Sequence, residues 1–384
     1  MALKGYIEGY YGRLLTWDQR SLILRKLNEL NMDFYIYGPK EDIYHRIKWF
    51  EQYKDKELAN FENFNENCET NGISFYYAIS PGLSYGDDPK SNFNLLTSKI
   101  SNFLDRGLKN FAIFLDDLEN EKDEKLGELH ANLIHEFSNY LEKNHGTSFV
   151  FCPTIYCERF AKKGIENSGY LKVLSERVPN SVSVMWTGRE VISKEITSND
   201  VSKFKSVLNN PVIIWDNYYA NDYCQNKFFV GPYRGREFSK DIIKGCGLNA
   251  TGMPITDSII LSQFKGESTT EEIFQEFEVP PEFIEIFHFF DGPFEFNSSL
   301  ETIKKLKNVQ NIFQKICVDW KSELQLEWAP FLWQFFKDLH FLENYSKMKK
   351  EKVLKEWAGQ RYSEPLLNIL LKGKKLRIII LFLV

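Results

Sequence analysis

Short runs of β-branched and aromatic residues alternate with segments of helical periodicity along the first two thirds of the chain. This alternation is typical of parallel strands connected by crossover helices. Eight runs can be counted, at Gly5–Glu8, Asp33–Tyr37, Ser74–Ile79, Asn110–Leu115, Phe149–Thr154, Val182–Trp186, Pro211–Trp215 and Ile243–Leu248. A closed (β/α)8 barrel requires eight strands, whereas an open doubly wound sheet more often has about five to seven. We therefore predict an α/β fold, a (β/α)8 TIM-like barrel followed by a C-terminal helical region.

Local signals mark where helices begin between these strands. Thr16 and Gln19 form a capping-box pattern, in which two side chains satisfy backbone N–H groups at a helix start. Leucines then recur on one face, so we predict that this helix runs to about Leu30. Ser198-Asn-Asp opens another helix before the seventh strand.

The strand–helix alternation stops after about Gly266, and two consecutive prolines, Pro280 and Pro281, mark a boundary. We predict a barrel domain over residues 1–270 and a helical, stalk-like domain over residues 271–384. Apolar residues at three- and four-residue steps predict one long amphipathic helix from Glu301 through Trp320. The segment Trp328–Tyr345 is so rich in Phe, Leu and Trp that it must bury against a neighbouring helix or a second subunit.

Charge and composition argue against several classes of partner. The net charge is -5 at pH 7, which gives no general attraction to nucleic acid or to anionic lipid. Six cysteines are spread through the chain without a CxxC pair, and the six histidines are scattered. Neither a disulfide scaffold nor a metal site is indicated. We expect no cofactor, no metal, no nucleic acid and no membrane as partner.

The two ends of the sequence bear on where the protein works. Strand-like sequence begins almost at once in MALKGYIEGYYG and leaves no room for a signal peptide. We expect a cytoplasmic protein, or a secreted one whose leader has been removed. Seven consecutive apolar residues from Ile378 form the other end. Because a bilayer span needs roughly 20 such residues, a frayed end or a packed strand is favoured over an anchor.

Two adjacent carboxylates, Asp116 and Asp117, follow the apolar run Phe111–Leu115. Barrel enzymes carry their catalytic groups at the C-terminal ends of the strands. Neighbouring Asp side chains repel each other's charge, so one pKa rises and one carboxyl can hold a proton while the other stays ionised. That division suits general acid–base catalysis. A solvated strand end or a helix N-cap would also place Asp here, and the segment alone does not decide.

Polar and aromatic residues also follow the other predicted strands. They are Lys40, Tyr156, Thr187, Trp215, Asn217, Asp222 and Asn249. In a closed barrel they converge on the same rim as the two aspartates. Carboxylates and amides bind sugar hydroxyls, while aromatic faces cover the apolar side of a sugar ring. Together these residues favour a carbohydrate pocket.

Seven ordered blocks of the sequence resemble glycoside hydrolase family 84, the O-GlcNAcase family. The blocks are Glu8-Gly-Tyr-Tyr-Gly-Arg13 with Trp17, Tyr37-Gly-Pro-Lys-Glu-Asp42 with His45-Arg46, Ala78-Ile-Ser-Pro-Gly82, Phe114-Leu-Asp-Asp117, Phe151-Cys-Pro-Thr154 with Tyr156-Cys157, Trp186-Thr-Gly188 with Ser193-Lys-Glu-Ile196, and Trp215-Asp-Asn217 with Ala220-Asn-Asp-Tyr223. The resemblance implies retaining, substrate-assisted hydrolysis of terminal β-linked N-acetylglucosamine, which is an exception to the usual two-carboxylate scheme. O-GlcNAc on Ser or Thr of glycoproteins is the substrate that it favours.

The resemblance also implies a role for each matching residue. Asp116 would polarise the 2-acetamido group, whose carbonyl oxygen attacks the anomeric carbon to form an oxazoline, and Asp117 would protonate the leaving oxygen and then activate water. Asp116 must then stay ionised, whereas Asp117 needs a raised pKa. Contacts with sugar hydroxyls are implied for Gly9, Lys40 and Asp222, and the acetamido group and its pocket for Asn217, Tyr156, Cys152, Thr187 and Trp215. Asn249 matches a sugar-binding Asn, although Ala250-Thr251 follows where the family has Pro.

Other functions stay open at this stage. The chain could be a hexosaminidase or hyaluronidase acting on glycans, or a non-catalytic barrel that binds N-acetylglucosamine. Paired carboxylates could also bind magnesium. The expected partner is a glycosylated protein or a glycan with terminal GlcNAc. The helical region could form a homodimer or shape the substrate cleft, and the sequence favours neither.

Overall fold

The structure is a computed structural model that describes residues 2–118, 123–239, 241–294 and 308–345. The chain forms two compact units. The first comprises residues 1–217 and 234–252, and the second comprises residues 218–233 and 253–384. The predicted domain boundary at residue 270 remains a prediction, and the helix that precedes it is grouped with the second unit.

The first unit is a closed barrel of eight parallel strands in the spatial order β1-β10-β8-β6-β5-β4-β3-β2. The strands are β1 (Leu3–Glu8), β2 (Phe34–Tyr37), β3 (Ser74–Ile79), β4 (Asn110–Phe114), β5 (Ser148–Cys152), β6 (Ser183–Trp186), β8 (Val212–Asp216) and β10 (Gly245–Asn249). Each predicted run overlaps one of these strands, so the predicted barrel is confirmed. Two further strands, β7 (Ile196–Thr197) and β9 (Arg236–Glu237), pair with each other in a separate small sheet.

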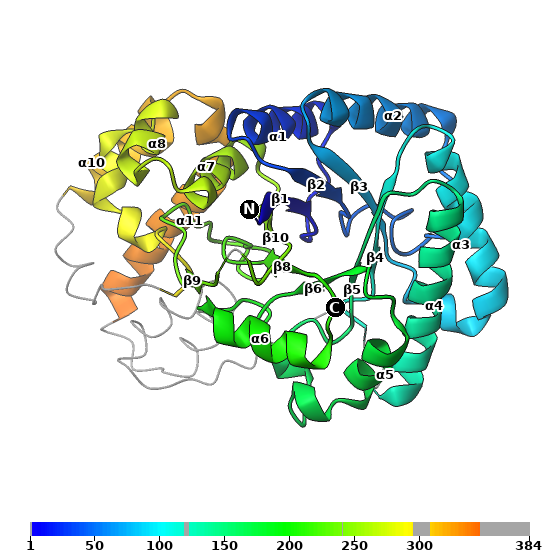
Figure 1. Cartoon of the computed structure of the whole chain (residues 1–384). Coiled ribbons are helices and arrows are strands. Elements are labelled where there is room, and N and C mark those ends of the chain that lie inside the picture. Colours follow the sequence, from blue (N-terminus) through cyan, green and yellow to red (C-terminus); the bar gives the residue numbers. More distant parts are fainter. Residues whose placement is uncertain (1, 119–122, 240, 295–307, 346–384) are drawn as a thin grey trace. The chain divides into compact units, whose positions relative to one another are not determined.

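Helices connect consecutive barrel strands and lie around the outside of the barrel (Figure 1). They are α1 (Trp17–Glu29), α2 (Asp55–Thr70), α3 (Pro89–Leu104), α4 (Glu124–Lys143), α5 (Gly169–Arg177) and α6 (Ser198–Val207). The capping box at the start of α1 is confirmed, since the Gln19 N–H donates to Thr16 Oγ1 at 3.3 Å and the Thr16 N–H to Gln19 Oε1 at 2.9 Å. Helix α6 begins at Ser198 as predicted, with a second capping box between Thr197 and Asp200.

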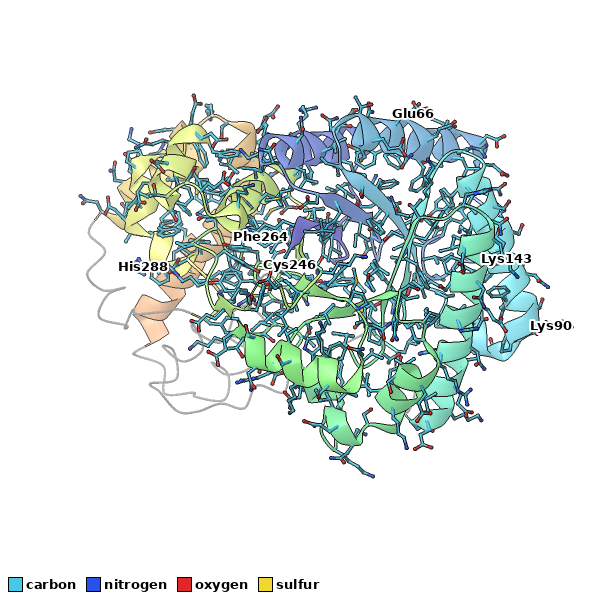
Figure 2. All side chains as sticks on the ribbon, in the orientation of Figure 1. Glu66, Lys90, Lys143, Cys246, Phe264 and His288 are labelled. Carbon is cyan, nitrogen blue, oxygen red and sulfur yellow. The ribbon has the colours of Figure 1, made fainter. Side chains whose placement is uncertain are left out.

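The inside of the barrel is filled by side chains from strands β1 to β6 and β8. This core includes Ile7, Ile36, Ala78, Ala112, Phe114, Val150, Cys152, Met185, Ile213 and Trp215. Figure 2 shows the contrast with the outer helices, because Glu66, Lys90 and Lys143 point away from the fold while Cys246 on β10 lies inside it. The barrel is therefore a packed core, and polar chemistry is confined to the loops at the strand ends.

Two buried histidines are held neutral inside this unit. His130 on α4 accepts the Tyr170 hydroxyl at Nδ1 (3.0 Å), because that hydroxyl already accepts the Thr154 N–H. Burial lowers the pKa of His130 to about 3. His45 donates from Nδ1 to the Ala78 carbonyl at 2.8 Å. Burial and the Lys40 ammonium lower the pKa of His45 to about 3 as well.

We expect the free energy of unfolding to fall as the pH drops from 7 to 5. An unfolded His titrates near about 6.5, whereas His130 in the fold titrates at about 3. The stability is therefore present above the unfolded pKa and is lost progressively between the two values. At about 1.4 kcal/mol per pH unit, His130 alone should cost about 2 kcal/mol at pH 5.

Urea unfolding at both pH values measures this loss. In His130→Asn, which keeps an acceptor for Tyr170, the difference in unfolding free energy between pH 7 and pH 5 should shrink by about 2 kcal/mol. His135 lies exposed on the same helix, so His135→Asn is the matched control and should leave the difference unchanged. Equal pH dependence in His130→Asn and the unsubstituted protein would rule the explanation out.

The second unit is helical. It contains α7 (Pro254–Lys265), α8 (Thr270–Glu276), α10 (Val309–Gln314), a π-helical turn at Lys315–Asp319, and α11 (Glu323–Tyr345). The predicted burial of the aromatic segment from Trp328 is confirmed for most of its described apolar side chains, namely Trp328, Phe331, Leu332, Phe335 and Leu339, whereas Trp333 is exposed. The Trp328 ring stacks on Phe228 with centroids 4.8 Å apart. No described helix is long and apolar enough to cross a membrane.

The predicted long helix from Glu301 through Trp320 is wrong at its C-terminal end. Residues 301–307 lie outside the described residues, as does the apolar C-terminus from Ile378. After α10 the chain makes the π-helical turn, and the Trp320 N–H donates to the Lys315 carbonyl at 2.9 Å. Trp320 itself is extended, with ψ 125°. The predicted apolar face is confirmed where it is described, since Ile312, Phe313 and Ile316 are buried, but the steps of three and four residues do not reveal that the last turn is π-helical.

Candidate active site

Asp116 and Lys40 form a buried ion pair at the rim of the barrel. Asp116 lies two residues beyond β4, and Lys40 follows β2, where its Nζ donates to Asp116 Oδ2. The ammonium lies 5.6 Å from the Phe114 ring centroid and 5.9 Å from that of Trp215. Among the described residues, Asp116 Oδ1 is buried and has no hydrogen-bond partner. A buried carboxylate oxygen without a partner is costly, so it marks a place where a donor fits.

Asp117 turns away from the strand direction. Its φ is +50°, in the left-handed region that Asp tolerates better than most residues. Its Oδ2 accepts the Tyr11 hydroxyl at 2.8 Å and lies 3.9 Å from Lys40 Nζ, while its Oδ1 accepts the Tyr156 hydroxyl at 3.0 Å. The two adjacent carboxylates therefore have different surroundings, one bound by an ammonium and the other by two phenols.

We expected a raised pKa for Asp117 and an ionised Asp116, and the shifts of the two pKa values have the opposite direction. Burial raises the pKa of Asp116, and the nearby Lys40 charge offsets this only in part. Burial also raises the pKa of Asp117, but Lys40 and the hydrogen bonds from Tyr11 and Tyr156 outweigh it and bring that pKa below its usual value. Mutual repulsion predicts only that one of the two pKa values rises, and the family resemblance assigned that rise to Asp117. The two phenol donors stabilise its ionised form instead.

A chain of amides joins three strands and one loop. The Gly9 N–H donates to Asn249 Oδ1 at 3.2 Å, and Asn249 Nδ2 donates to Asn217 Oδ1 at 2.8 Å. Trp215 Nε1 donates to the same Asn217 oxygen at 2.9 Å, and Asn217 Nδ2 donates to the Val191 carbonyl at 2.8 Å. The predicted sugar-binding amides are thus brought together and fix each other's orientation.

Gly9 cannot carry a side chain in this position. A Cβ on Gly9 would lie 2.4 Å from Cζ2 of Trp215. The backbone at Gly9 lies directly against the indole ring of Trp215, so only glycine fits here.

Tyr156, Thr187 and Cys152 lie together on the β5–β6 side of the rim. The Thr187 N–H donates to the Tyr156 carbonyl at 2.8 Å, and Thr187 Oγ1 donates to the Glu190 carbonyl at 2.7 Å. Cys152 is buried in the same core cluster as Tyr156 and Trp215. Burial raises the pKa of its thiol well above the usual value, so it is a small apolar wall residue and not a nucleophile.

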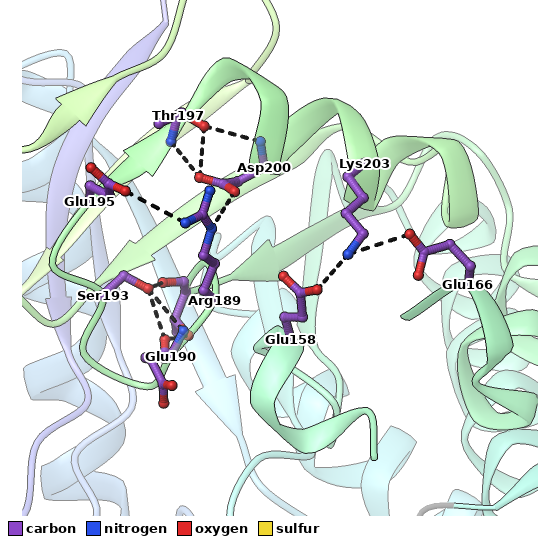
Figure 3. Close-up of polar contacts among 10 residues, drawn as sticks. Glu158, Glu166, Arg189, Glu190, Ser193, Glu195, Thr197, Asp200 and Lys203 are labelled. Atoms are coloured by element: carbon purple, nitrogen blue, oxygen red, sulfur yellow. Dashed lines mark hydrogen bonds and ion pairs between the residues drawn. The ribbon is translucent and has the colours of Figure 1, made fainter. Parts of the chain in front are cut away.

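The loop after β6, which carries Thr187 and Val191, is fixed by polar contacts on its outer side (Figure 3). Ser193 Oγ donates to the Thr187 carbonyl at 2.8 Å. The Arg189 guanidinium pairs with Asp200 at 2.7 Å, which anchors the loop to the first turn of α6. The carbonyl that orients Asn217 is therefore held by a rigid turn.

The Trp215-Asp-Asn217 block contains one structural residue. Asp216 is buried and forms a two-pronged ion pair with Arg236, with distances of 2.6 and 2.7 Å. Asp222 belongs to the second unit, where its Oδ1 accepts the Tyr223 N–H at 2.9 Å. Its predicted contact with the sugar remains a prediction.

Tyr11 and Arg46 were not among the predicted site residues. Tyr11 reaches Asp117, and the Arg46 guanidinium lies 5.7 Å from the Tyr11 ring centroid. Both residues lie inside sequence blocks that carry the family resemblance, and Tyr11 is only two residues from Gly9. Their positions after β1 and β2, within these blocks, could have identified them as site residues from the sequence.

The site has the parts needed for acid–base chemistry on a neutral polar substrate. It combines two carboxylates, one ammonium, a ring of oriented amides and the face of an indole. Within the described part of the chain, no group of three or more His, Cys, Asp and Glu side chains is arranged to hold a metal ion. The Lys40 ammonium already places a positive charge at the aspartate pair.

Comparisons with known proteins agree with this chemistry. The sequence profile of the family described as beta-N-acetylglucosaminidase matches residues 4–263. The chain is 33% identical over 241 residues to proteins named Protein O-GlcNAcase from Rattus norvegicus and Mus musculus, covering 61% of this chain. The match spans only 26% of the length of these relatives. A mutant of the Thermobaculum terrenum O-GlcNAc hydrolase has a similar fold, with a TM-score of 0.77 and 23% identity over 96% of this chain and 93% of that one.

Proposed function

Since the chain belongs to the β-N-acetylglucosaminidase family, we propose that it hydrolyses terminal β-linked N-acetylglucosamine with retention of configuration, by substrate-assisted catalysis. In this mechanism the substrate's own acetamide is the nucleophile, and the protein supplies positioning and proton transfer.

The unpartnered Oδ1 of Asp116 carries this proposal. An acetamide is a weak nucleophile until a carboxylate accepts its N–H and stabilises the positive charge that develops during cyclisation. Asp116 offers one oxygen for that N–H while Lys40 binds the other. Burial raises the pKa of Asp116, and the Lys40 charge opposes this rise and so favours the ionised state that the reaction requires.

Asp117 is the proposed acid and base. It would donate its proton to the glycosidic oxygen as the acetamide carbonyl attacks, and would then take a proton from the water that opens the oxazoline. Tyr156 would hold its second oxygen in place through both steps. No side chain of the protein therefore has to act as the nucleophile, because the substrate's acetamide does so.

The remaining predicted residues would bind the sugar. Trp215, Cys152 and Thr187 supply a small, largely apolar pocket wall suited to the acetamide methyl group. Asn217 would face the acetamide, while Gly9, Lys40, Asn249 and Asp222 would contact sugar hydroxyls. The amides of Asn217 and Asn249 are already oriented by each other, so they lose little freedom when the sugar binds.

We propose a GlcNAc-modified Ser or Thr of a glycoprotein as the substrate, in line with the names of the curated relatives. Glycans or hyaluronan are the alternative, and comparing turnover of a glycopeptide and a polysaccharide separates the two. A cytoplasmic location and a homodimer through the helical region also remain predictions, and a mass measured in solution tests the second.

We expect the protein to cleave an aryl N-acetyl-β-glucosaminide and to release the β-anomer first, as judged by NMR of the fresh product. Activity should persist in the presence of a chelator. The analogue with a 2-hydroxyl in place of the acetamide should react at least about 10³-fold more slowly, because it lacks the internal nucleophile. Release of the α-anomer, or equal turnover of the two substrates, would contradict the mechanism. Binding without any turnover would favour the non-catalytic alternative.

A further inference from the structure

Tyr11 lies over Asp117 and is tied to the neighbouring loop. Its hydroxyl donates to Asp117 Oδ2 at 2.8 Å. The Arg46 guanidinium lies 5.7 Å from its ring centroid, and the next residue, Gly12, donates its N–H to Glu41 Oε1 at 2.8 Å. The loop after β1 is thus held to the loop after β2 at Tyr11 and at Gly12.

The two tyrosines on Asp117 differ in how easily they can leave. Tyr156 is 7% exposed and packs edge to face on Phe160 with centroids 5.1 Å apart. Tyr11 is 37% exposed, although its hydroxyl reaches the carboxylate. Tyr11 is therefore the more accessible of the two to a molecule that enters from solvent, whereas Tyr156 is packed within the barrel rim.

On the basis of the proposed function, we propose that Tyr11 is a positioning residue for the proton donor: its hydroxyl holds Asp117 Oδ2 before substrate binds, and gives that oxygen up to the glycosidic oxygen in the complex.

The protonation state that the first step needs favours such an exchange. For acid catalysis, Asp117 must carry one proton, which passes to the glycosidic oxygen as the bond between that oxygen and the anomeric carbon breaks. The electron pair of the broken bond stays on the oxygen, and water later returns a proton to Asp117. The Tyr11 O–H and the glycosidic oxygen compete for the space beside Asp117 Oδ2, and the Tyr11 hydrogen bond favours the ionised carboxylate over the protonated form that the first step needs. Displacement of Tyr11 removes a donor that favours the ionised carboxylate.

The other charged and titratable groups around Asp117 do not account for such a change. Lys40 and Arg46 come from the loop after β2, Asp116 from the end of β4, and Tyr156 and Cys152 from the end of β5. Lys40 is anchored on Asp116, and Cys152 and Tyr156 are buried. Unlike these groups, Tyr11 is exposed and also donates a hydrogen bond directly to the Asp117 carboxylate.

Tyr11→Phe tests the inference through the pH dependence of hydrolysis of a poor leaving group. The parameter kcat/KM reports the free protein and kcat reports the complex. On the alkaline side, kcat/KM should rise about tenfold relative to the unsubstituted protein, because the Asp117 proton is bound more tightly. The acid side should not change, since Asp117 is already protonated there. The profile of kcat should also be unchanged, because Tyr11 has left Asp117 in the complex.

Two variants complete the experiment. Tyr156→Phe should move the alkaline side of both kcat and kcat/KM, because Tyr156 stays on Asp117 throughout. Tyr85→Phe alters a buried tyrosine outside the site and should change neither profile. A loss in Tyr11→Phe that is equal at every pH, no change at all, or equal shifts of kcat and kcat/KM would each overturn the inference. Failure of the proposed function itself would show differently, as full activity of Asp117→Asn on poor leaving groups.

Discussion

Asp117→Asn should lose about 10²- to 10⁴-fold in kcat/KM on substrates with poor leaving groups, and much less on activated aryl glycosides. An alkoxide from Ser or Thr cannot depart without a proton, so the substitution removes what the first chemical step needs. An activated phenolate departs unaided. The ratio of kcat/KM between the two substrates therefore measures the acid role directly. A general loss of structure would lower kcat/KM for both substrates and leave this ratio unchanged.

The second step offers an independent check on Asp117. With an activated substrate the oxazoline still forms, but water has lost its base, so the intermediate should accumulate and kcat should fall. Azide needs no base and should restore turnover in Asp117→Asn, yielding a β-glycosyl azide. Asp123 caps the following helix from an exposed position. Asp123→Asn, which keeps the capping ability, is the matched control and should retain full activity. Equal losses on both leaving groups would contradict the acid role.

The barrel could be predicted because each of its strands is visible in the sequence as a short run of apolar residues. Strands that cross the core are short and mostly apolar, and eight such segments of four to six residues alternate with helical segments. Strands β7 and β9 have two residues each, too few to produce a pattern. The predicted helix ends one residue early, at Asp319, and its last turn is π-helical, which the composition of the segment does not reveal.

Most residues of the site could be predicted from the sequence, but the direction of the pKa shifts of Asp116 and Asp117 could not. Position after a strand, together with the family resemblance, identified Lys40, Tyr156 and the two aspartates. The direction of the Asp117 pKa depends on which phenols reach which oxygen, and the donors come from residues 11 and 156, in loops far apart in sequence. Similarly, Asn217 and Asn249 were identified separately, whereas their mutual hydrogen bond depends on the exact meeting of β8 and β10.

Asp116→Asn should lower kcat/KM about 10²- to 10³-fold on poor and activated leaving groups alike, because stabilisation of the developing positive charge is needed whatever group departs. The amide that replaces the carboxylate is neutral, and Lys40 would be left buried beside it without its ion-pair partner. Breaking a buried pair costs about 3–5 kcal/mol, so unfolding must be measured alongside activity.

A second variant separates the chemical loss from the loss of stability. Lys40→Met removes the opposite partner of the same ion pair and leaves the Asp116 carboxylate buried without a counter-charge, which should raise the pKa of Asp116. On an activated aryl glycoside, which needs no acid, its activity should then recover as the pH rises and Asp116 ionises. Asp116→Asn should remain impaired at every pH, since it has no group to ionise. An Asp116→Asn protein that is folded and cleaves activated glycosides at the normal rate would remove Asp116 from the reaction, and with it the acetamide-assisted mechanism.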